Sequence, residues 1–198
     1  MTAPRTLLQL AGADPTPARV ADASLVLIDM QNEYRSGPIA VTGADAAIAS
    51  AARLLDAARA SGAPVIHVAH AGRPGGLFDR TAARGQIVEA LAPAEGEAVI
   101  EKTLPNAFAG TSLADQLALA GRSNVIIIGF MTHMCVSTTA RAALDHGYRV
   151  TIDASSCATR DLPDRKGGVI PAGTLHDVAL AELTDRFAVV VSSPDALL

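Results

Sequence analysis

Short apolar runs alternate with longer amphipathic stretches along most of this chain. Most of the short runs are apolar on both faces of an extended chain, which predicts strands that are buried on both faces. The predicted strands are Ser24–Asp29, Pro64–Ala69, Ala98–Glu101, Asn124–Gly129, Arg149–Asp153 and Ala188–Val191.

The stretches between these runs predict helices. Apolar residues recur at helical spacing in Asp45–Ser61, and Gly62 followed by Pro64 predicts where that helix ends. Ser112 and Asp115 form a pattern like a capping box, which predicts the start of a second helix. The predicted helices are Asp45–Ser61, Ser112–Ala120, Cys135–His146 and Thr174–Leu183.

Buried strands that alternate with helices indicate an α/β fold. We expect a three-layer α/β/α sandwich with a mainly parallel sheet of about six strands and right-handed crossovers. Residues 1–23, which include three prolines, are interpreted as an N-terminal arm, and residues 24–198 as a single domain. In such sheets, ligands bind beyond the carboxyl ends of the strands, so that edge is where chemistry is sought.

Composition removes several classes of function. The net charge of -4 and the absence of a Lys/Arg-rich run argue against a nucleic-acid or anionic-membrane partner. Aromatic residues make up only 3% of the chain, which leaves little for stacking on bases or sugars. We expect no signal peptide and no membrane span. With only Cys135 and Cys157 present, we expect a cytoplasmic protein with free thiols.

Three residues at predicted strand exits could perform chemistry together. Asp29, Lys102 and Cys135 also have ordinary interpretations as a turn cap, a solvated charge and a core cysteine, respectively. Cys135 lies where a helix is predicted to begin, which would lower the pKa of the thiol and favour the thiolate. A nucleophile, a cation and a carboxylate at one sheet edge form a complete set for covalent catalysis.

The motifs around these residues carry a resemblance to a known family. LVLIDMQNEY, VIEKTLPNAF and IIIGFMTHMCVSTTARAALDHGY, in this order, resemble the isochorismatase-like cysteine hydrolase superfamily, which includes nicotinamidases and N-carbamoylsarcosine amidohydrolases. The similarity extends from about Leu25 to Val191. The resemblance implies a homodimer or homotetramer.

The resemblance also implies a role for each matching residue. Cys135 would be the nucleophile, Asp29 the general acid and base, and Lys102 the positive partner. The family places a cis peptide bond at Phe130–Met131, which would direct the N–H groups of Met131 and Cys135 at a developing oxyanion.

Neighbouring residues are weaker candidates for substrate contacts. Gln31, Phe108 and His133 could line a pocket, although turn polarity explains Gln31 and core packing explains Phe108 equally well. Cys157 is interpreted as structural. Specificity is expected in the loops Glu33–Val41 and Gly72–Gln86; Arg73, Arg80 and Arg84 in the second loop would suit a carboxylate or simply be solvated.

The pattern does not predict a metal or a cofactor. His67 and His70 lie three apart in a predicted strand and so point to opposite faces, and the next acidic residue is Asp79. His146 and His176 have no partner in the sequence. No G-x-G-x-x-G follows the first strand, which argues against a dinucleotide binder.

The sequence therefore predicts an enzyme that acts on a small molecule. The preferred hypothesis is hydrolysis of an amide-type C–N bond through an acyl-enzyme on Cys135. The alternative is an isochorismatase-type hydrolase of a vinyl ether, which needs an acid but no nucleophile. A third hypothesis is a non-catalytic relative that serves as a binding protein.

Overall fold

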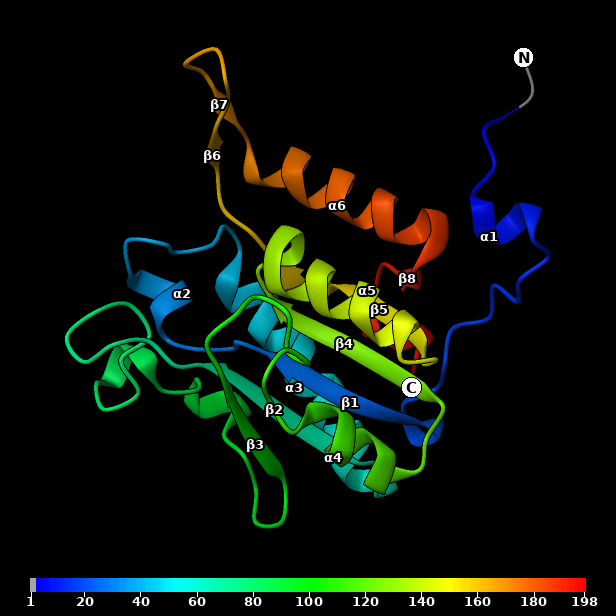
Figure 1. The fold of residues 1–198 in the computed structure, drawn as a ribbon, viewed down its shortest axis with the longest axis horizontal. Coiled ribbons are helices and arrows are strands. Elements are labelled where there is room, and N and C mark those ends of the chain that lie inside the picture. Colours follow the sequence, from blue (N-terminus) through cyan, green and yellow to red (C-terminus); the bar gives the residue numbers. More distant parts are fainter. Residues whose placement is uncertain (1–2) are drawn as a thin grey trace.

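The computed structural model describes residues 3–198 and is built around one parallel sheet. Its six strands lie in the order β3-β2-β1-β4-β5-β8, and every neighbouring pair is parallel (Figure 1). β1 and β4 occupy the centre of the sheet and are almost entirely buried. The strands are β1 Ala23–Ile28, β2 Val65–His70, β3 Ala98–Lys102, β4 Asn124–Phe130, β5 Arg149–Ala158 and β8 Ala188–Val191.

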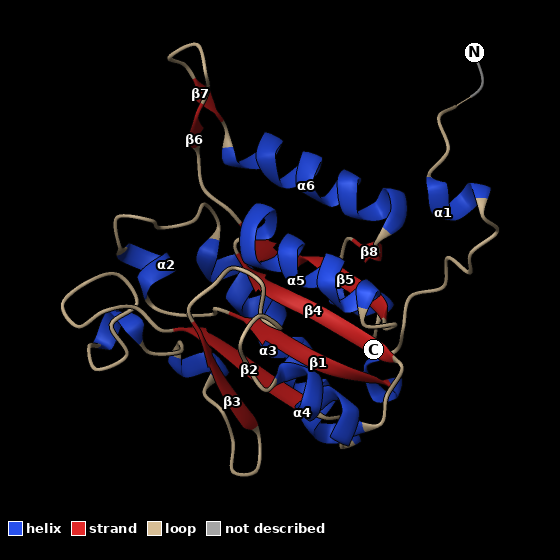
Figure 2. Cartoon of the chain, in the orientation of Figure 1, coloured by secondary structure: helices blue, strands red, loops and turns tan. Residues whose placement is uncertain are grey.

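Helices cover both faces of this sheet, as Figure 2 shows. α3 lies on one face, and α4, α5 and α6 lie on the other, which follows from right-handed crossovers on either side of β1. The helices are α1 Leu7–Leu10, α2 Glu33–Ser36, α3 Ala44–Ser61, α4 Leu113–Ala120, α5 Ser137–Asp145 and α6 Ala172–Arg186. The predicted three-layer α/β/α sandwich is therefore confirmed.

Two short segments extend the domain. α1 docks on α6, where the Leu7 N–H donates to Asp185 Oδ1 over 2.8 Å. Strands β6, Leu162–Pro163, and β7, Val169–Ile170, pair with each other in an antiparallel hairpin that projects from the body (Figure 1).

The structure corrects two local predictions. Ser112 makes no side-chain capping bond at the start of α4; the Leu113 N–H donates instead to Thr111 Oγ1. The helix predicted to begin at Cys135 begins as a π-helical turn, Thr132–Val136, before α5. Cys135 therefore sits inside a wide turn rather than at the first residue of an α-helix.

Gly129 shows why the central strands can approach each other so closely. Its φ is +128°, and a Cβ there would lie 2.0 Å from the carbonyl oxygen of Ile28 on β1. The position next to the end of β1 therefore requires glycine.

We predict that Gly129→Ala destabilises the protein strongly. The clash with β1 adds to the cost of an unfavourable φ, which alone is about 1–3 kcal/mol. Gly110→Ala is the control, because its φ is +68° but a Cβ there meets nothing within 4 Å. Urea unfolding should show the larger loss for Gly129→Ala; equal losses would contradict the argument.

Candidate active site

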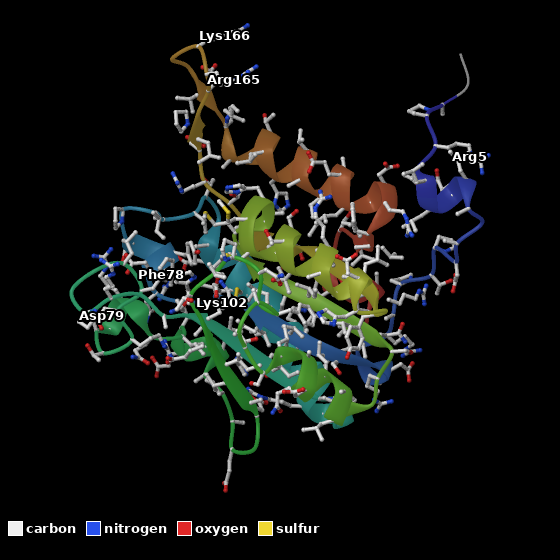
Figure 3. All side chains as sticks on the ribbon, in the orientation of Figure 1. Arg5, Phe78, Asp79, Lys102, Arg165 and Lys166 are labelled. Atoms are coloured by element: carbon white, nitrogen blue, oxygen red, sulfur yellow. The ribbon has the colours of Figure 1, made fainter. Side chains whose placement is uncertain are left out.

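The structure brings Asp29, Lys102 and Cys135 together at the carboxyl edge of the sheet. Asp29 directly follows β1, Lys102 ends β3, and Cys135 lies in the π-helical turn after β4. Their exposed fractions are 0%, 2% and 4%, so the cluster is enclosed by the chain. Figure 3 marks Lys102 at this edge.

The Lys102 ammonium contacts the other two members of the cluster. Its Nζ lies 2.7 Å from Asp29 Oδ2 and 3.4 Å from Cys135 Sγ. A third neighbour, His70 Nδ1, lies 3.2 Å from the same Nζ. Both carboxylate oxygens of Asp29 are buried: Oδ2 forms the ion pair with Lys102, and Oδ1 has no hydrogen bond among the described residues.

Burial sets the protonation of the thiol and of the carboxyl group. Burial and the Asp29 charge raise the pKa of the Cys135 thiol to about 12, against the opposing effect of Lys102. Burial likewise raises the pKa of the Asp29 carboxyl, and Lys102 opposes that rise. The expectation of a lowered Cys135 pKa is therefore wrong: burial favours the neutral thiol, and the pKa of the neighbouring Asp29 carboxyl is raised as well.

Gln31 fixes the strand ends rather than lining the pocket. Its side-chain amide donates to the carbonyl oxygens of His70 and Gly85 over 3.0 and 2.6 Å, and it accepts from the His70 N–H over 2.8 Å. The side chain is fully buried. Its hydrogen-bonding groups are occupied by backbone, so Gln31 fastens β2 and the 72–86 loop to the segment after Asp29.

Phe108 takes the packing position that was one of its two interpretations from the sequence. Its ring stacks on His146 at a centroid distance of 4.4 Å. His146 follows α5, eleven residues after Cys135, which places it about 15 Å further along a helical path. Phe108 therefore packs beside the end of α5 and against the hydrophobic core.

The segment after β4 has the backbone that the resemblance implied. The peptide bond between Phe130 and Met131 is cis. Thr132 Oγ1 and His176 Nδ1 of α6 lie 2.9 Å apart. His133 Nδ1 bonds to Thr159 Oγ1 after β5, and burial lowers the pKa of His133. His133 thus lies within the turn that carries Cys135, and its Nδ1 is engaged by Thr159.

An aromatic wall beside the cluster was missed from the sequence. We define this wall as Tyr34, His70, Phe78 and Phe130, whose neighbouring rings have centroids 4.8–5.5 Å apart. Burial raises the pKa of Tyr34, and the charges of Asp29 and Cys135 add to the effect. The wall contains three of the six Phe and Tyr residues of the chain. The few aromatic residues are therefore concentrated beside this cluster.

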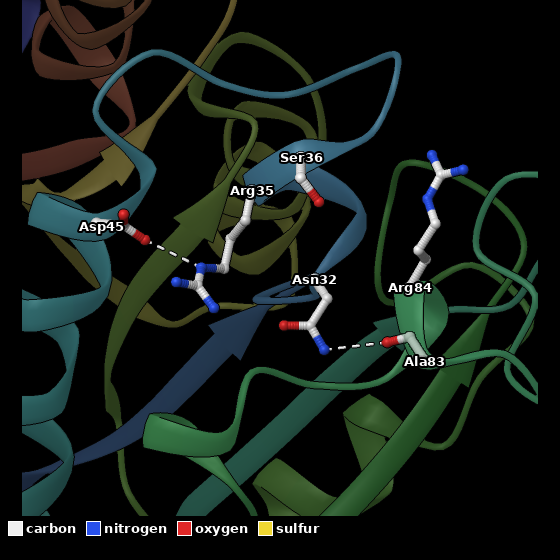
Figure 4. Close-up of a pocket in the computed structure, with 6 residues that line it drawn as sticks. All are labelled: Asn32, Arg35, Ser36, Asp45, Ala83 and Arg84. Atoms are coloured by element: carbon white, nitrogen blue, oxygen red, sulfur yellow. Dashed lines mark hydrogen bonds and ion pairs between the residues drawn. The ribbon is translucent and has the colours of Figure 1, made fainter.

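The two predicted specificity loops are tied to each other. Buried Glu33 pairs with Arg84 and accepts from the Phe78 N–H, while Arg80 pairs with Glu101 over 3.0 Å. An open pocket of about 430 Å³ lies beside these loops, and Figure 4 draws the residues that line it. Its lining residues are Asn32, Arg35, Ser36, Asp45, Ala83 and Arg84, so the pocket lies outside the enclosed cluster.

The two histidines of β2, His67 and His70, contact different neighbours. Buried His67 bonds through Nε2 to Glu97 over 2.9 Å, whereas His70 faces Lys102. Within residues 3–198, no group of three or more His, Cys, Asp or Glu side chains is arranged to hold a metal ion. None of the helices in that range is long and apolar enough to cross a membrane.

Comparisons with known proteins agree with this architecture. The isochorismatase domain model matches residues 23–195. A crystal structure of an isochorismatase from Pseudomonas putida is 48% identical, with a TM-score of 0.95, and the match covers 99% of this chain and all of that one. A secreted isochorismatase effector of Verticillium dahliae is 38% identical over 93% of this chain and 95% of its own length.

A third relative carries a different activity in its name. The maleamate amidohydrolase of Pseudomonas putida is 30% identical over 88% of this chain and 84% of its own length. The fold and these relatives define the protein as a hydrolase. The chain belongs to the isochorismatase family.

We predict that removing the two charges beside Cys135 changes its reactivity in opposite directions. Asp29 raises the pKa of the thiol, so Asp29→Asn should speed alkylation by iodoacetamide at a fixed, near-neutral pH. Lys102 lowers that pKa, so Lys102→Met should slow it. Each unit of pKa changes the thiolate fraction about tenfold. Peptide mapping would report the rates; changes of the same sign would refute the assigned electrostatics.

Proposed function

We propose that this protein hydrolyses an amide-type C–N bond of a small molecule through a covalent acyl-enzyme on Cys135. One observation carries the proposal: a single buried ammonium, Lys102, contacts both a carboxylate and a thiol. This arrangement supplies a nucleophile, its base and a fixed positive charge in an enclosed site.

The proposed reaction uses each of these groups in turn. Asp29 takes the proton from Cys135 as the sulfur attacks the carbonyl carbon of the substrate. The resulting oxyanion would be stabilised by the Met131 and Cys135 N–H groups, a role that the family resemblance suggests. Asp29 then returns the proton to the leaving nitrogen as the C–N bond breaks.

Hydrolysis of the acyl-enzyme repeats the sequence with water. Asp29 takes a proton from water, the oxygen adds to the thioester, and the C–S bond breaks as the sulfur regains a proton. Lys102 stays protonated and stabilises the carboxylate and the developing thiolate in turn. The raised pKa of Asp29 suits this role, because it makes the carboxylate a stronger base.

The names of relatives support two chemistries. The maleamate amidohydrolase acts, by its name, on an amide, whereas the closely similar crystal structure and the fungal effector are named isochorismatases. Protonating a vinyl ether requires an acid but no nucleophile. The contact between Lys102 and Cys135 Sγ therefore favours the amide reaction.

We predict that an amide substrate leaves its acyl group on Cys135. The enzyme would be mixed with a panel of small amides that includes maleamate, quenched with acid and examined by intact-mass spectrometry. A burst of ammonia or amine should accompany an adduct of acyl mass on the Cys135 peptide. Cys135→Ala should abolish both.

Cys157→Ala provides the matched control. Cys157 is also buried, but it lies within β5, beside Gly129 of β4. Cys157→Ala should retain the burst and the adduct. The absence of an adduct on any amide, together with full isochorismate cleavage by Cys135→Ala, would assign the vinyl-ether reaction instead. Inactivity of the wild-type protein on both substrate classes would favour a binding protein.

We also propose that the chain forms a homodimer or homotetramer. The β6–β7 hairpin pairs with no other strand of the described chain, and Val169 is 63% exposed on it. An isolated two-stranded hairpin is only marginally stable in water, so contact with a second copy would stabilise it.

Light scattering should therefore return a multiple of the 20.2 kDa chain mass. Val169→Lys should shift the distribution toward the monomer. A mass of one chain at micromolar concentration would contradict the proposed assembly.

A cytoplasmic location stays a prediction. It rests on the two free cysteines, which a reducing compartment would preserve. The fungal relative is secreted, according to its name.

A further inference from the structure

We propose that His70 is a positioning residue of this site, whose Nδ1 accepts a hydrogen bond from Lys102 and holds the ammonium against Asp29 and Cys135. This inference rests on the proposed function, because it takes Lys102 as the cation of that reaction. It adds a member to the set of residues on which the reaction depends.

Sheet order explains why Lys102 needs such a partner. β3 is separated from β1 by β2, so Lys102 must extend across β2 to reach Asp29. His70 is the residue of β2 that lies directly opposite Lys102 in the register. The lysine side chain therefore passes the imidazole on its way to the carboxylate.

Hydrogen-bond capacity assigns the direction of the contact. A lysine ammonium has three donors and no acceptor, so His70 Nδ1 must accept and the ring proton must reside on Nε2. The three neighbours of Nζ are Asp29 Oδ2, Cys135 Sγ and His70 Nδ1, at 2.7, 3.4 and 3.2 Å. Each donor then has one acceptor, and an unmatched donor at this depth would be costly.

The imidazole is electrically neutral where this contact is needed. Burial, and then the charge of Lys102, lower the pKa of His70 to about 4. The other groups that contact the ammonium are the Asp29 carboxylate after β1 and the Cys135 thiol in the turn after β4. Because the imidazole is neutral, it orients the ammonium without forming a second ion pair that would compete with the Lys102–Asp29 pair.

His70 is itself held rigidly, as a positioning residue must be. Gln31 bonds to both its N–H and its carbonyl oxygen, at 2.8 and 3.0 Å. Its ring packs at 4.8 Å on Phe78, which Figure 3 marks on the 72–86 loop. Gln31 thus fixes the backbone of His70, and Phe78 packs against its ring.

The alternative is that His70 matters only as a packing partner of Phe78. Two variants separate the roles. His70→Asn places a carbonyl oxygen near the position of Nδ1 but removes the ring. His70→Phe keeps a ring against Phe78 but removes the acceptor.

The experiment measures steady-state kinetics and alkylation of Cys135 by iodoacetamide in both variants. In His70→Phe, kcat should fall about 10- to 100-fold with KM little changed, the scale of one hydrogen bond to a charged group. Cys135 alkylation should slow as well, because the ammonium no longer stays fixed beside the sulfur. His70→Asn should recover most of both rates.

His67→Phe is the control on the same strand. His67 is buried and bonds to Glu97. Glu97 directly precedes β3, so it lies at the amino end of that strand, whereas Lys102 lies at the carboxyl end. Its replacement should lower the melting temperature without changing the alkylation rate of the folded enzyme. This comparison separates general destabilisation from an effect on Lys102.

Three results would overturn the inference: a folded His70→Asn as impaired as His70→Phe, a fully active His70→Phe, or a loss confined to KM. Should circular dichroism show His70→Phe to be unfolded, His70→Leu replaces it and His70→Asn remains decisive. Alkylation requires no substrate. If no acyl adduct forms but the alkylation pattern holds, the proposed reaction fails and the role of His70 stands.

Discussion

The structure depends on accommodating one buried ammonium. Lys102 is 2% exposed, and a cation at that depth is tolerated only with acceptors around it. Those acceptors come from the ends of β1 and β2 and from the turn after β4. Four consecutive strands of the sheet must therefore end at one level, which parallel pairing in fixed register achieves.

The same burial determines how the nucleophile is activated. A thiol with a pKa of about 12 holds little negative charge at neutral pH, so no preformed thiolate waits in the site. In the proposed reaction, Asp29 therefore removes the proton as the sulfur attacks the substrate. Its free Oδ1 and its raised pKa make it suited to that transfer.

Much of this arrangement could be predicted from the sequence because it depends on strand ends. Continuous apolar runs located the strands, and the rule that parallel strands end at a common edge brought Asp29, Lys102 and Cys135 to one place. His70 obeys the same rule, since it ends β2, but it was considered only as a metal ligand. The fixing role of Gln31 was not visible, because its partners lie 39 and 54 residues away.

The error about the thiol shows where local reasoning stops. A helix N-terminus is a local feature, and it suggested that the Cys135 pKa would be lowered. The actual start is a π-helical turn, and the dominant effect on the pKa of the thiol is burial. The order of the strands determines which residues meet at the edge of the sheet. The segments packed over that edge determine how strongly those residues are desolvated. Desolvation has the larger effect on the pKa of the Cys135 thiol. That pKa therefore depends on the enclosed cluster more than on the local sequence motif.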